Sequence, residues 1–374
     1  MTTNWQQPLT LPNGATLKNR IMMAPMTTYS SETNGDVSDQ ELAYYARRAK
    51  SGIGAVITAC AYVQPQGAGF IYSIGAESDD RLPSLKRLAS AIKDNGSTAI
   101  LQIFHAGRQS NSKVLNGGTP VSASAVAYPR DGAETPRELT ADEVEETIRA
   151  FGKATRRAIE AGFDGVEIHG ANTYLIHQFF SPHSNRRNDK WGEDRSAFPL
   201  AVVAEVKRVA KEFAPSNFII GYRFSPEENT DPGFTIEEKL SLIDKLADQN
   251  LDYLHISLGE FFDQSYTDET GTPRIARFAE VIDGRTPLVG VGSLNTNSDI
   301  DRAAASGYAD LFAIGRPIVT DPEWYPKLVE GKEDLLLTEI DPTNQDALDI
   351  PDALWEKILN VTGWFPVKQP TEKH

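Results

Sequence analysis

The chain has 374 residues, of which 40% are hydrophobic and 24% charged, as in ordinary globular proteins. Its net charge of −15 argues against a nucleic-acid surface, and its single cysteine, Cys60, excludes a disulfide framework, a cysteine-ligated zinc site and an iron–sulfur cluster. The N-terminal residues lack the regions of a signal peptide, and the longest near-apolar run, 53–63, is too short to span a bilayer, so we expect a cytoplasmic protein.

Short apolar runs recur along the chain and alternate with segments of helical spacing. In chain order, the apolar runs predict strands at 20–26, 55–61, 99–104, 165–169, 218–224, 253–256, 288–291 and 311–314. The segments between them predict helices at 39–50, 82–92, 140–160, 198–213, 235–249, 275–281, 297–306 and 322–328. Thr140 and Glu143 form a capping-box pattern, and Gly162 is suited to end the same helix in the left-handed conformation.

Strands that are apolar on both faces and alternate with helices predict a parallel sheet covered by helices. Eight such units predict a single-domain α/β protein, a closed (β/α)8 TIM barrel over residues 1–336, with a loop insertion at 110–136. Residues 337–374 form a C-terminal extension that we expect to pack on or beside the barrel. The alternative is an open doubly wound sheet, but Gly52-Ile53-Gly54 and Gly290-Val291-Gly292 both lack the third glycine of its usual fingerprint.

Polar residues collect where the predicted strands end. In a barrel of this kind, catalytic groups lie at the carboxyl ends of the strands. The ends read Pro25-Met26-Thr27-Thr28-Tyr29, His105-Ala106-Gly107-Arg108, His169-Gly170-Ala171-Asn172, Ser225-Pro226-Glu227, Gly292-Ser293 and Gly315-Arg316-Pro317. We therefore predict an active site at this end of the barrel.

The fourth strand end places a ring nitrogen, an amide and a phenol within six residues. His169 and Asn172 can both donate to one oxygen, and Tyr174 can supply a proton nearby. That combination can hold a carbonyl and protonate a neighbouring carbon. The alternative is a strand end with incidental polar residues.

The seventh and eighth strand ends predict a phosphate site. Gly292 and Gly315 let backbone amides approach an anion, and Arg316 can clamp phosphate oxygens. Ser293 begins a turn into the helix expected at 297–306, whose N-terminus favours negative charge. The alternative is a glycine turn with a surface arginine.

Longer motifs occur together along most of the chain. They are Leu17-Lys18-Asn19-Arg20-Ile21, Ala24-Pro25-Met26-Thr27, Gln102-Ile103-Phe104-His105-Ala106-Gly107-Arg108, Gly165 to Tyr174, His177-Gln178-Phe179-Phe180-Ser181-Pro182, Ser184-Asn185-Arg186-Arg187 and Asp310 through Arg316. With these motifs the chain resembles the Old Yellow Enzyme family of ene-reductases. The resemblance implies bound FMN, NADH or NADPH as the electron donor, and reduction of the C=C bond of α,β-unsaturated carbonyl or nitro compounds.

The resemblance also implies which residues contact the cofactor. They are Pro25, Met26, Thr27, Ala59, Gln102, Arg223, Gly292, Ser293, Gly315 and Arg316. Thr27 is expected near flavin N5 and O4, and Ala59 makes a backbone contact to the ring. Gln102 is expected at the pyrimidine edge, with the cation of Arg223 beside N1 and C2=O. The last four residues of the set form the phosphate site.

At the substrate, the resemblance makes His169 and Asn172 the pair that binds the carbonyl oxygen and Tyr174 the proton donor. Tyr29 stands where part of the family has a second active-site phenol. Thr27 and the histidine–asparagine pair fit one branch of the family, whereas Tyr29 fits the branch in which a neighbouring subunit's arginine completes the site. The chain alone leaves the oligomeric state open, and a homo-oligomer is compatible with it.

Several polar residues have a structural interpretation. We expect Glu167 to be a buried carboxylate paired with Arg20 or Arg223. Cys60 is expected to be buried and inert, and His177 to serve packing. No His-Glu-x-x-His spacing occurs, and no metal site is predicted.

Two other functions fit part of the pattern. A barrel lyase or aldolase acting on a phosphorylated substrate would need a Schiff-base lysine or metal carboxylates at a strand end, and no predicted strand end carries a lysine. A non-catalytic flavin-binding protein would not need Tyr174. In the preferred interpretation, the partners are small-molecule activated alkenes, with no nucleic acid and no membrane.

Overall fold

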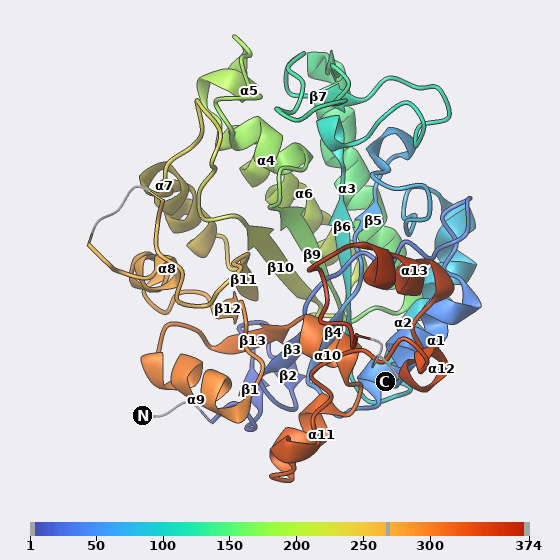
Figure 1. Ribbon diagram of the computed structural model, residues 1–374. Coiled ribbons are helices and arrows are strands. Elements are labelled where there is room, and N and C mark those ends of the chain that lie inside the picture. The colour runs from blue at the N-terminus through green and yellow to red at the C-terminus, as the bar shows by residue number, and fades with distance from the viewer. Residues whose placement is uncertain (1–3, 267–269, 370–374) are drawn as a thin grey trace.

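Eight parallel strands close into a barrel in the computed structural model, which describes residues 4–266 and 270–369. Around the barrel the order is β3, β4, β6, β9, β10, β11, β12, β13 and back to β3 (Figure 1). The bounds are β3 (Ile21–Met23), β4 (Ala55–Ile57), β6 (Thr98–Phe104), β9 (Gly165–Gly170), β10 (Ile219–Phe224), β11 (Tyr253–Ile256), β12 (Leu288–Val291) and β13 (Leu311–Ile314). The predicted (β/α)8 barrel is confirmed, and the doubly wound alternative is wrong.

Helices surround the strands at the predicted places. The longer ones are α1 (Asp39–Ala49), α2 (Leu82–Lys93), α3 (Ala141–Ala161), α6 (Ala197–Phe213), α7 (Ile236–Ala247), α8 (Arg274–Ile282), α9 (Asn297–Ser306) and α13 (Asp352–Asn360). The shorter ones are α4 (Leu175–Phe180), α5 (Lys190–Glu193), α10 (Arg316–Thr320), α11 (Trp324–Val329) and α12 (Gln345–Leu348). The capping box of Thr140 and Glu143 is present, and Gly162 ends α3 at a φ of 89°. Within the described ranges, no helix is long and apolar enough to cross a membrane.

The first two barrel strands are shorter than predicted, for local reasons. Pro25 has no N–H to add to the ladder, and β3 already ends at Met23. Thr58 N–H still donates to Ile100 O of β6, and the chain then leaves the ladder, because the Thr58 hydroxyl donates to Ala59 O and the Ala59 N–H donates to Tyr45 Oη. The short strand β5 (Ala61–Tyr62) then pairs with β6.

The amino end of the barrel is closed by the N-terminal hairpin. Strands β1 (Leu9–Thr10) and β2 (Thr16–Leu17) pair antiparallel, and Leu17 is buried in a cluster with Met22 and Ile100 from the barrel interior. This apolar plug leaves the carboxyl end as the place for a polar site.

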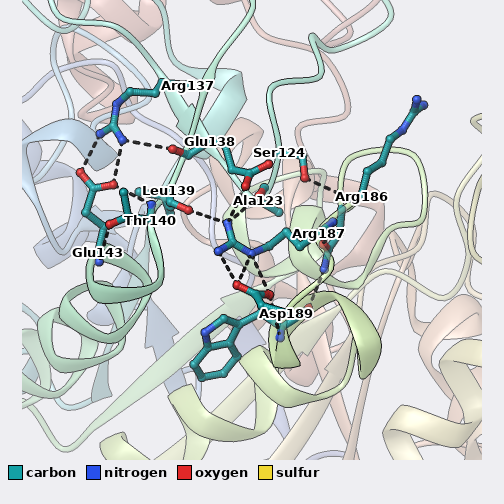
Figure 2. A network of polar contacts seen from close by, with 12 residues as sticks. Ala123, Ser124, Arg137, Glu138, Leu139, Thr140, Glu143, Arg186, Arg187 and Asp189 are labelled. Carbon is teal, nitrogen blue, oxygen red and sulfur yellow. Dashed lines mark hydrogen bonds and ion pairs between the residues drawn. The ribbon is translucent and has the colours of Figure 1, made fainter.

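The insertion after β6 is anchored by a buried arginine. Arg187, whose side chain is 4% exposed, pairs with Asp189 at 2.6 Å and donates to the carbonyls of Ala123 and Leu139 (Figure 2). These carbonyls flank the small parallel pair β7 (Val121–Ser122) and β8 (Arg137–Glu138). The predicted loop at 110–136 is therefore tied to the segment before α5.

The C-terminal extension packs against the barrel. Asp352 at the start of α13 accepts a hydrogen bond from the Gln40 side chain of α1, and the Asp349 carbonyl accepts one from the buried Arg48. Its apolar residues Leu354, Trp355, Ile358 and Phe365 belong to the same core cluster as the barrel. The division of the chain into a barrel and an extension at residue 336 remains a prediction.

Candidate active site

A cavity of about 340 Å³ opens at the carboxyl end of the barrel. Its lining includes all the predicted cofactor residues except Ala59 and Gln102, namely Pro25, Met26, Thr27, Arg223, Gly292, Ser293, Gly315 and Arg316. The extension adds Leu354, Gly363, Trp364 and Phe365, which sequence reasoning did not find. Strands far apart in the sequence thus bring most of the predicted cofactor residues to one concave surface, the usual form of a ligand site.

The predicted phosphate end of the cavity is a tight backbone turn. Gly292 has a φ of 124°, and a Cβ there would lie 2.6 Å from the Glu260 carbonyl carbon, so only glycine fits. The Ser293 hydroxyl donates to Glu260 Oε1 at 2.7 Å, and Arg316 Nη1 donates to the Trp364 carbonyl at 3.3 Å. The guanidinium retains further donors for an anion.

The N-terminus of α9, which the sequence predicts to favour negative charge, already binds acidic side chains of the chain itself. The first amides of α9 are already used, because Asp299 and Thr296 form a capping box and Asn297 N–H donates to Glu333 Oε1 at 3.3 Å. This helix N-terminus therefore has an anionic partner within the chain. The glycine turns and Arg316 remain as the phosphate-binding features.

Arg223 and Asn172 contact each other at the carboxyl ends of β9 and β10. Arg223 Nη1 donates to Asn172 Oδ1 at 3.3 Å, and Asn172 Nδ2 donates to Ser257 Oγ at 3.1 Å. The Asn172 backbone, at a φ of 55°, is held by its N–H donating to Ser225 Oγ at 2.9 Å. Because its oxygen faces a cation, the amide nitrogen of Asn172 is turned to act as a donor.

His169 is held as a neutral donor. The Ala171 N–H approaches His169 Nδ1 at 3.4 Å, so Nδ1 is the acceptor and the ring hydrogen resides on Nε2. Burial, with Arg223 and His255 adding to the effect, places the pKa of His169 well below its ordinary value. Asn172 and His169 thus both retain an N–H at the same end of the barrel.

Tyr174 lies against His169. The two ring centroids are 5.0 Å apart in an edge-to-face arrangement, and Phe104 packs on Tyr174 at 5.1 Å. Burial, with the neighbouring Cys60 and Tyr29, raises the pKa of Tyr174, so the phenol keeps its proton. The structure therefore brings together the three residues predicted at the fourth strand end.

Tyr29 takes a left-handed backbone at a φ of 53° and packs edge-on against Phe70 at 5.1 Å. Lys357 of α13 places its Nζ 4.3 Å from the Tyr29 ring centroid. Sequence reasoning missed Lys357, because no strand-end pattern reaches a helix of the extension.

Cys60 is buried, as predicted, and burial raises its pKa to about 12, so it stays a thiol. The sequence does not predict the surroundings of Cys60. The Thr27 side chain forms a hydrogen bond with its sulfur, and Cys60 packs on Phe104 and Tyr174. The neighbouring Ala59 donates its N–H to Tyr45 Oη at 2.7 Å, and its carbonyl accepts one hydrogen bond, from the Thr58 hydroxyl at 2.8 Å. The second lone pair of this carbonyl is therefore left for a ligand.

His177 packs in the core as predicted, with its ring 4.9 Å from that of Phe234. Its Nε2 lies 3.4 Å from Glu228 Oε1, and both side chains are buried. His177 belongs to α4 itself, and the pair serves packing.

The donor set fits FMN. Arg223 is a largely buried cation, and its Nε lacks a hydrogen-bond partner in the described part of the chain. A cation with a free donor is suited to bind the electron-rich edge of a flavin ring. The turns at Gly292 and Gly315 with Arg316 suit a phosphate at the other end of the cavity. A closed (β/α)8 barrel with this donor set at its carboxyl end is compatible with a flavin-dependent barrel oxidoreductase.

Comparison with known proteins identifies the family. The model of the NADH:flavin oxidoreductase / NADH oxidase family matches residues 6–334, and the chain belongs to this family. The resemblance to Old Yellow Enzyme is thereby confirmed. FMN is the cofactor of this family, and the family's description names NADH as the electron donor.

Individual relatives agree with this assignment. The chain is 45% identical to the probable NADH-dependent flavin oxidoreductase YqiG of Bacillus subtilis, over 97% of each chain. It is 46% identical to the NADH:acrylate oxidoreductase of Vibrio harveyi over 92% of its own length, but it spans only 35% of that longer relative. Morphinone reductase in complex with tetrahydroNAD superposes with a TM-score of 0.75 at 26% identity, over 99% of both chains.

Proposed function

We propose that the protein takes hydride from NADH or NADPH and reduces the C=C bond of α,β-unsaturated carbonyl or nitro compounds. The observation that carries this proposal is the convergence of two neutral donors, His169 and Asn172, with the protonated phenol of Tyr174 at the carboxyl end of the barrel. A barrel that only bound a flavin would not need this combination.

The two donors would stabilise the negative charge that develops on the substrate during the reaction. Reduction of an activated alkene places negative charge on its carbonyl or nitro oxygen, and His169 Nε2 and Asn172 Nδ2 are turned to donate to that oxygen. Because His169 is neutral and Asn172 is braced by Ser225 and Ser257, neither donor has to reorient during the reaction. Such preorganised donors stabilise the transition state more than the bound substrate.

Tyr174 completes the reaction by giving its proton to the α-carbon. Its raised pKa keeps the phenol protonated until a strongly basic carbon forms beside it. When bound, FMN supplies the hydride transfer from the nicotinamide to the β-carbon.

The cofactor residues have the roles implied by the family resemblance. Thr27, Gln102 and Arg223 hold the ring, and Arg223 stabilises negative charge at its pyrimidine edge. Gly292, Ser293, Gly315 and Arg316 hold the phosphate, and Tyr29 borders the substrate.

The names of the relatives support an activated alkene as substrate. Acrylate and fumarate are alkenes conjugated to a carboxylate, and they are named for longer proteins of which the chain spans 35% and 39%. A lyase acting on a sugar phosphate has no counterpart among these relatives. The non-catalytic alternative differs from the proposal in not needing Tyr174.

Replacing Tyr174 with Phe tests the proposal. The variant should bind FMN and accept hydride from the nicotinamide at the wild-type rate, since its phenol takes no part in either step. Reduction of 2-cyclohexenone should slow, because the α-carbon loses its proton donor. Rapid-reaction measurements of the two half-reactions check this, with Tyr308→Phe as the matched control, because Tyr308 is a partly buried tyrosine that follows α9. Unchanged enone turnover would remove Tyr174 from the mechanism.

A further inference from the structure

A fully buried carboxylate lies inside the barrel and bonds to a predicted flavin residue. Glu167 on β9 has a side chain with 0% exposure. Its Oε1 accepts from Gln102 Nε2 at 2.7 Å, and its Oε2 accepts from Tyr253 Oη at 3.0 Å and from His255 Nδ1 at 2.9 Å. The cluster of Gln102, Glu167, Tyr253 and His255 is called the barrel cluster below.

The residues of the barrel cluster lie on three strands, β6, β9 and β11, and β10 lies between the last two. Glu167 is in register with Gln102 on β6 and with Gly221 on β10, and Gly221 is in register with Tyr253 on β11. A Cβ at Gly221 would lie 2.1 Å from the Tyr253 ring. The missing side chain at Gly221 therefore gives the tyrosine ring the space from which it reaches the carboxylate.

The carboxylate is ionised. Burial alone would raise the pKa of Glu167, but the hydrogen bonds from His255 and Gln102, together with the charge of Arg223, bring it below its ordinary value. Burial lowers the pKa of His255, so that ring is neutral and donates its Nδ1 hydrogen. The cation that balances Glu167 is therefore Arg223, and the expected alternative Arg20 instead donates to the Asp310 carbonyl.

An ionised carboxylate can only accept hydrogen bonds. The amide nitrogen of Gln102 must therefore face Glu167, which turns its carbonyl oxygen away from the carboxylate. Among the described residues, none donates a hydrogen bond to this oxygen. In this orientation, Gln102 offers an acceptor to a ring N–H, such as the one at the pyrimidine edge of a flavin.

We propose that Glu167 is a positioning residue for the flavin, which orients Gln102 through one carboxylate oxygen and partly balances the charge of Arg223. The inference rests on the proposed placement of Gln102 and Arg223 at the pyrimidine edge. Glu167 then has two separable effects. The length of its side chain, through Gln102, influences the affinity for FMN, and its negative charge lowers the reduction potential of the bound flavin.

The charge effect has a definite sign. Reduction adds negative charge to the flavin, and a buried carboxylate nearby opposes this addition. Glu167→Gln removes that charge and leaves Arg223 uncompensated, so the preference of the protein for reduced over oxidised FMN should rise about tenfold. For a two-electron couple, a tenfold change corresponds to an increase of about 30 mV.

The test is the midpoint potential of FMN-loaded Glu167→Gln, measured by dye equilibration, together with the FMN dissociation constant. The matched control is Glu41→Gln, which replaces another carboxyl with 0% exposure that bonds to Thr28 and Ser31 and whose pKa is raised by burial. The control should leave the potential unchanged. A Glu167→Gln potential equal to that of the wild type, or below it, overturns the inference.

A second variant covers the case in which Glu167→Gln fails to fold. Glu167→Asp keeps the charge but shortens the reach to Gln102 by one methylene, so FMN affinity should fall while the potential changes little. Unchanged FMN affinity overturns the inference. If the wild-type protein binds no FMN, the proposed function fails instead, and the two failures are thereby distinguished.

Discussion

Replacing Asn172 with Asp isolates one hydrogen-bond donor of the candidate site. The change keeps the size and shape of the side chain and tolerates the left-handed backbone at a φ of 55°, as Asn does. It exchanges the amide N–H for a carboxylate oxygen. Arg223, whose Nη1 lies 3.3 Å from Asn172 Oδ1, should keep the new group ionised.

The magnitude follows from the number of donors. Removal of one of two preorganised donors at a developing oxyanion typically costs about 10²–10³ in rate, or about 2.7–4 kcal/mol of transition-state stabilisation. The new carboxylate also repels the developing charge, so the loss should reach at least the upper part of this range. Hydride loss from the nicotinamide places no negative charge on its carboxamide oxygen, so that half-reaction should slow much less.

The assay is anaerobic stopped-flow measurement of the two half-reactions, with NADH or NADPH and then with 2-cyclohexenone. Asn250→Asp is the matched control, because Asn250 is another left-handed asparagine at a φ of 52° that lies before β11, at the opposite end of the barrel. Both half-reactions should be unaffected in the control. An enone half-reaction of Asn172→Asp within tenfold of the wild type would refute the oxyanion role of Asn172.

Two further predictions concern the cofactor and stability. Arg316→Gln should weaken FMN binding by about 10- to 150-fold, since charge-assisted hydrogen bonds contribute about 1.5–3 kcal/mol; equal weakening of riboflavin, which has no phosphate, would contradict the role of Arg316. For Glu228, burial would raise the pKa, but the His177 ring at 3.4 Å and the bonds from hydroxyl groups bring it to about 2 in the folded protein. Its stabilising contribution is then complete above its ordinary pKa of 4.5 and is lost as the pH falls toward 2. Urea unfolding of Glu228→Gln between pH 5 and 3 should show a shallower loss of stability than the wild type, and an identical slope would disprove this.

The strand positions could be predicted because parallel barrel strands are buried on both faces. The strands at 253–256, 288–291 and 311–314 agree with the structure residue by residue. At 20–26 and 55–61 the apolar pattern extends past the last residue that pairs with a neighbouring strand. An apolar residue indicates burial, whereas strand pairing also depends on the hydrogen bonds that the backbone can form. Pro25 has no donor, and the hydroxyl of Tyr45 accepts from Ala59, which no local pattern reveals.

The candidate site could be predicted in part because topology alone carries strand ends to one place. The sequence by itself determined that His169, Asn172 and Tyr174 share the carboxyl end of the barrel with Arg223 and Arg316. Tertiary structure alone decided which atoms face which. The bond between Gln102 and Glu167 depends on the register of β6 and β9, and the approach of Tyr253 depends on the missing side chain at position 221.

The contributions of the C-terminal extension were beyond the reach of the sequence for the same reason. The contact of Lys357 with the Tyr29 ring joins residues more than three hundred positions apart. The hydrogen bond from Arg316 to the Trp364 carbonyl joins residues nearly fifty positions apart. A periodic pattern records which residues are buried within one element, because burial follows from the period of that element. It does not record which elements meet, since that is settled only when the whole chain packs its side chains together.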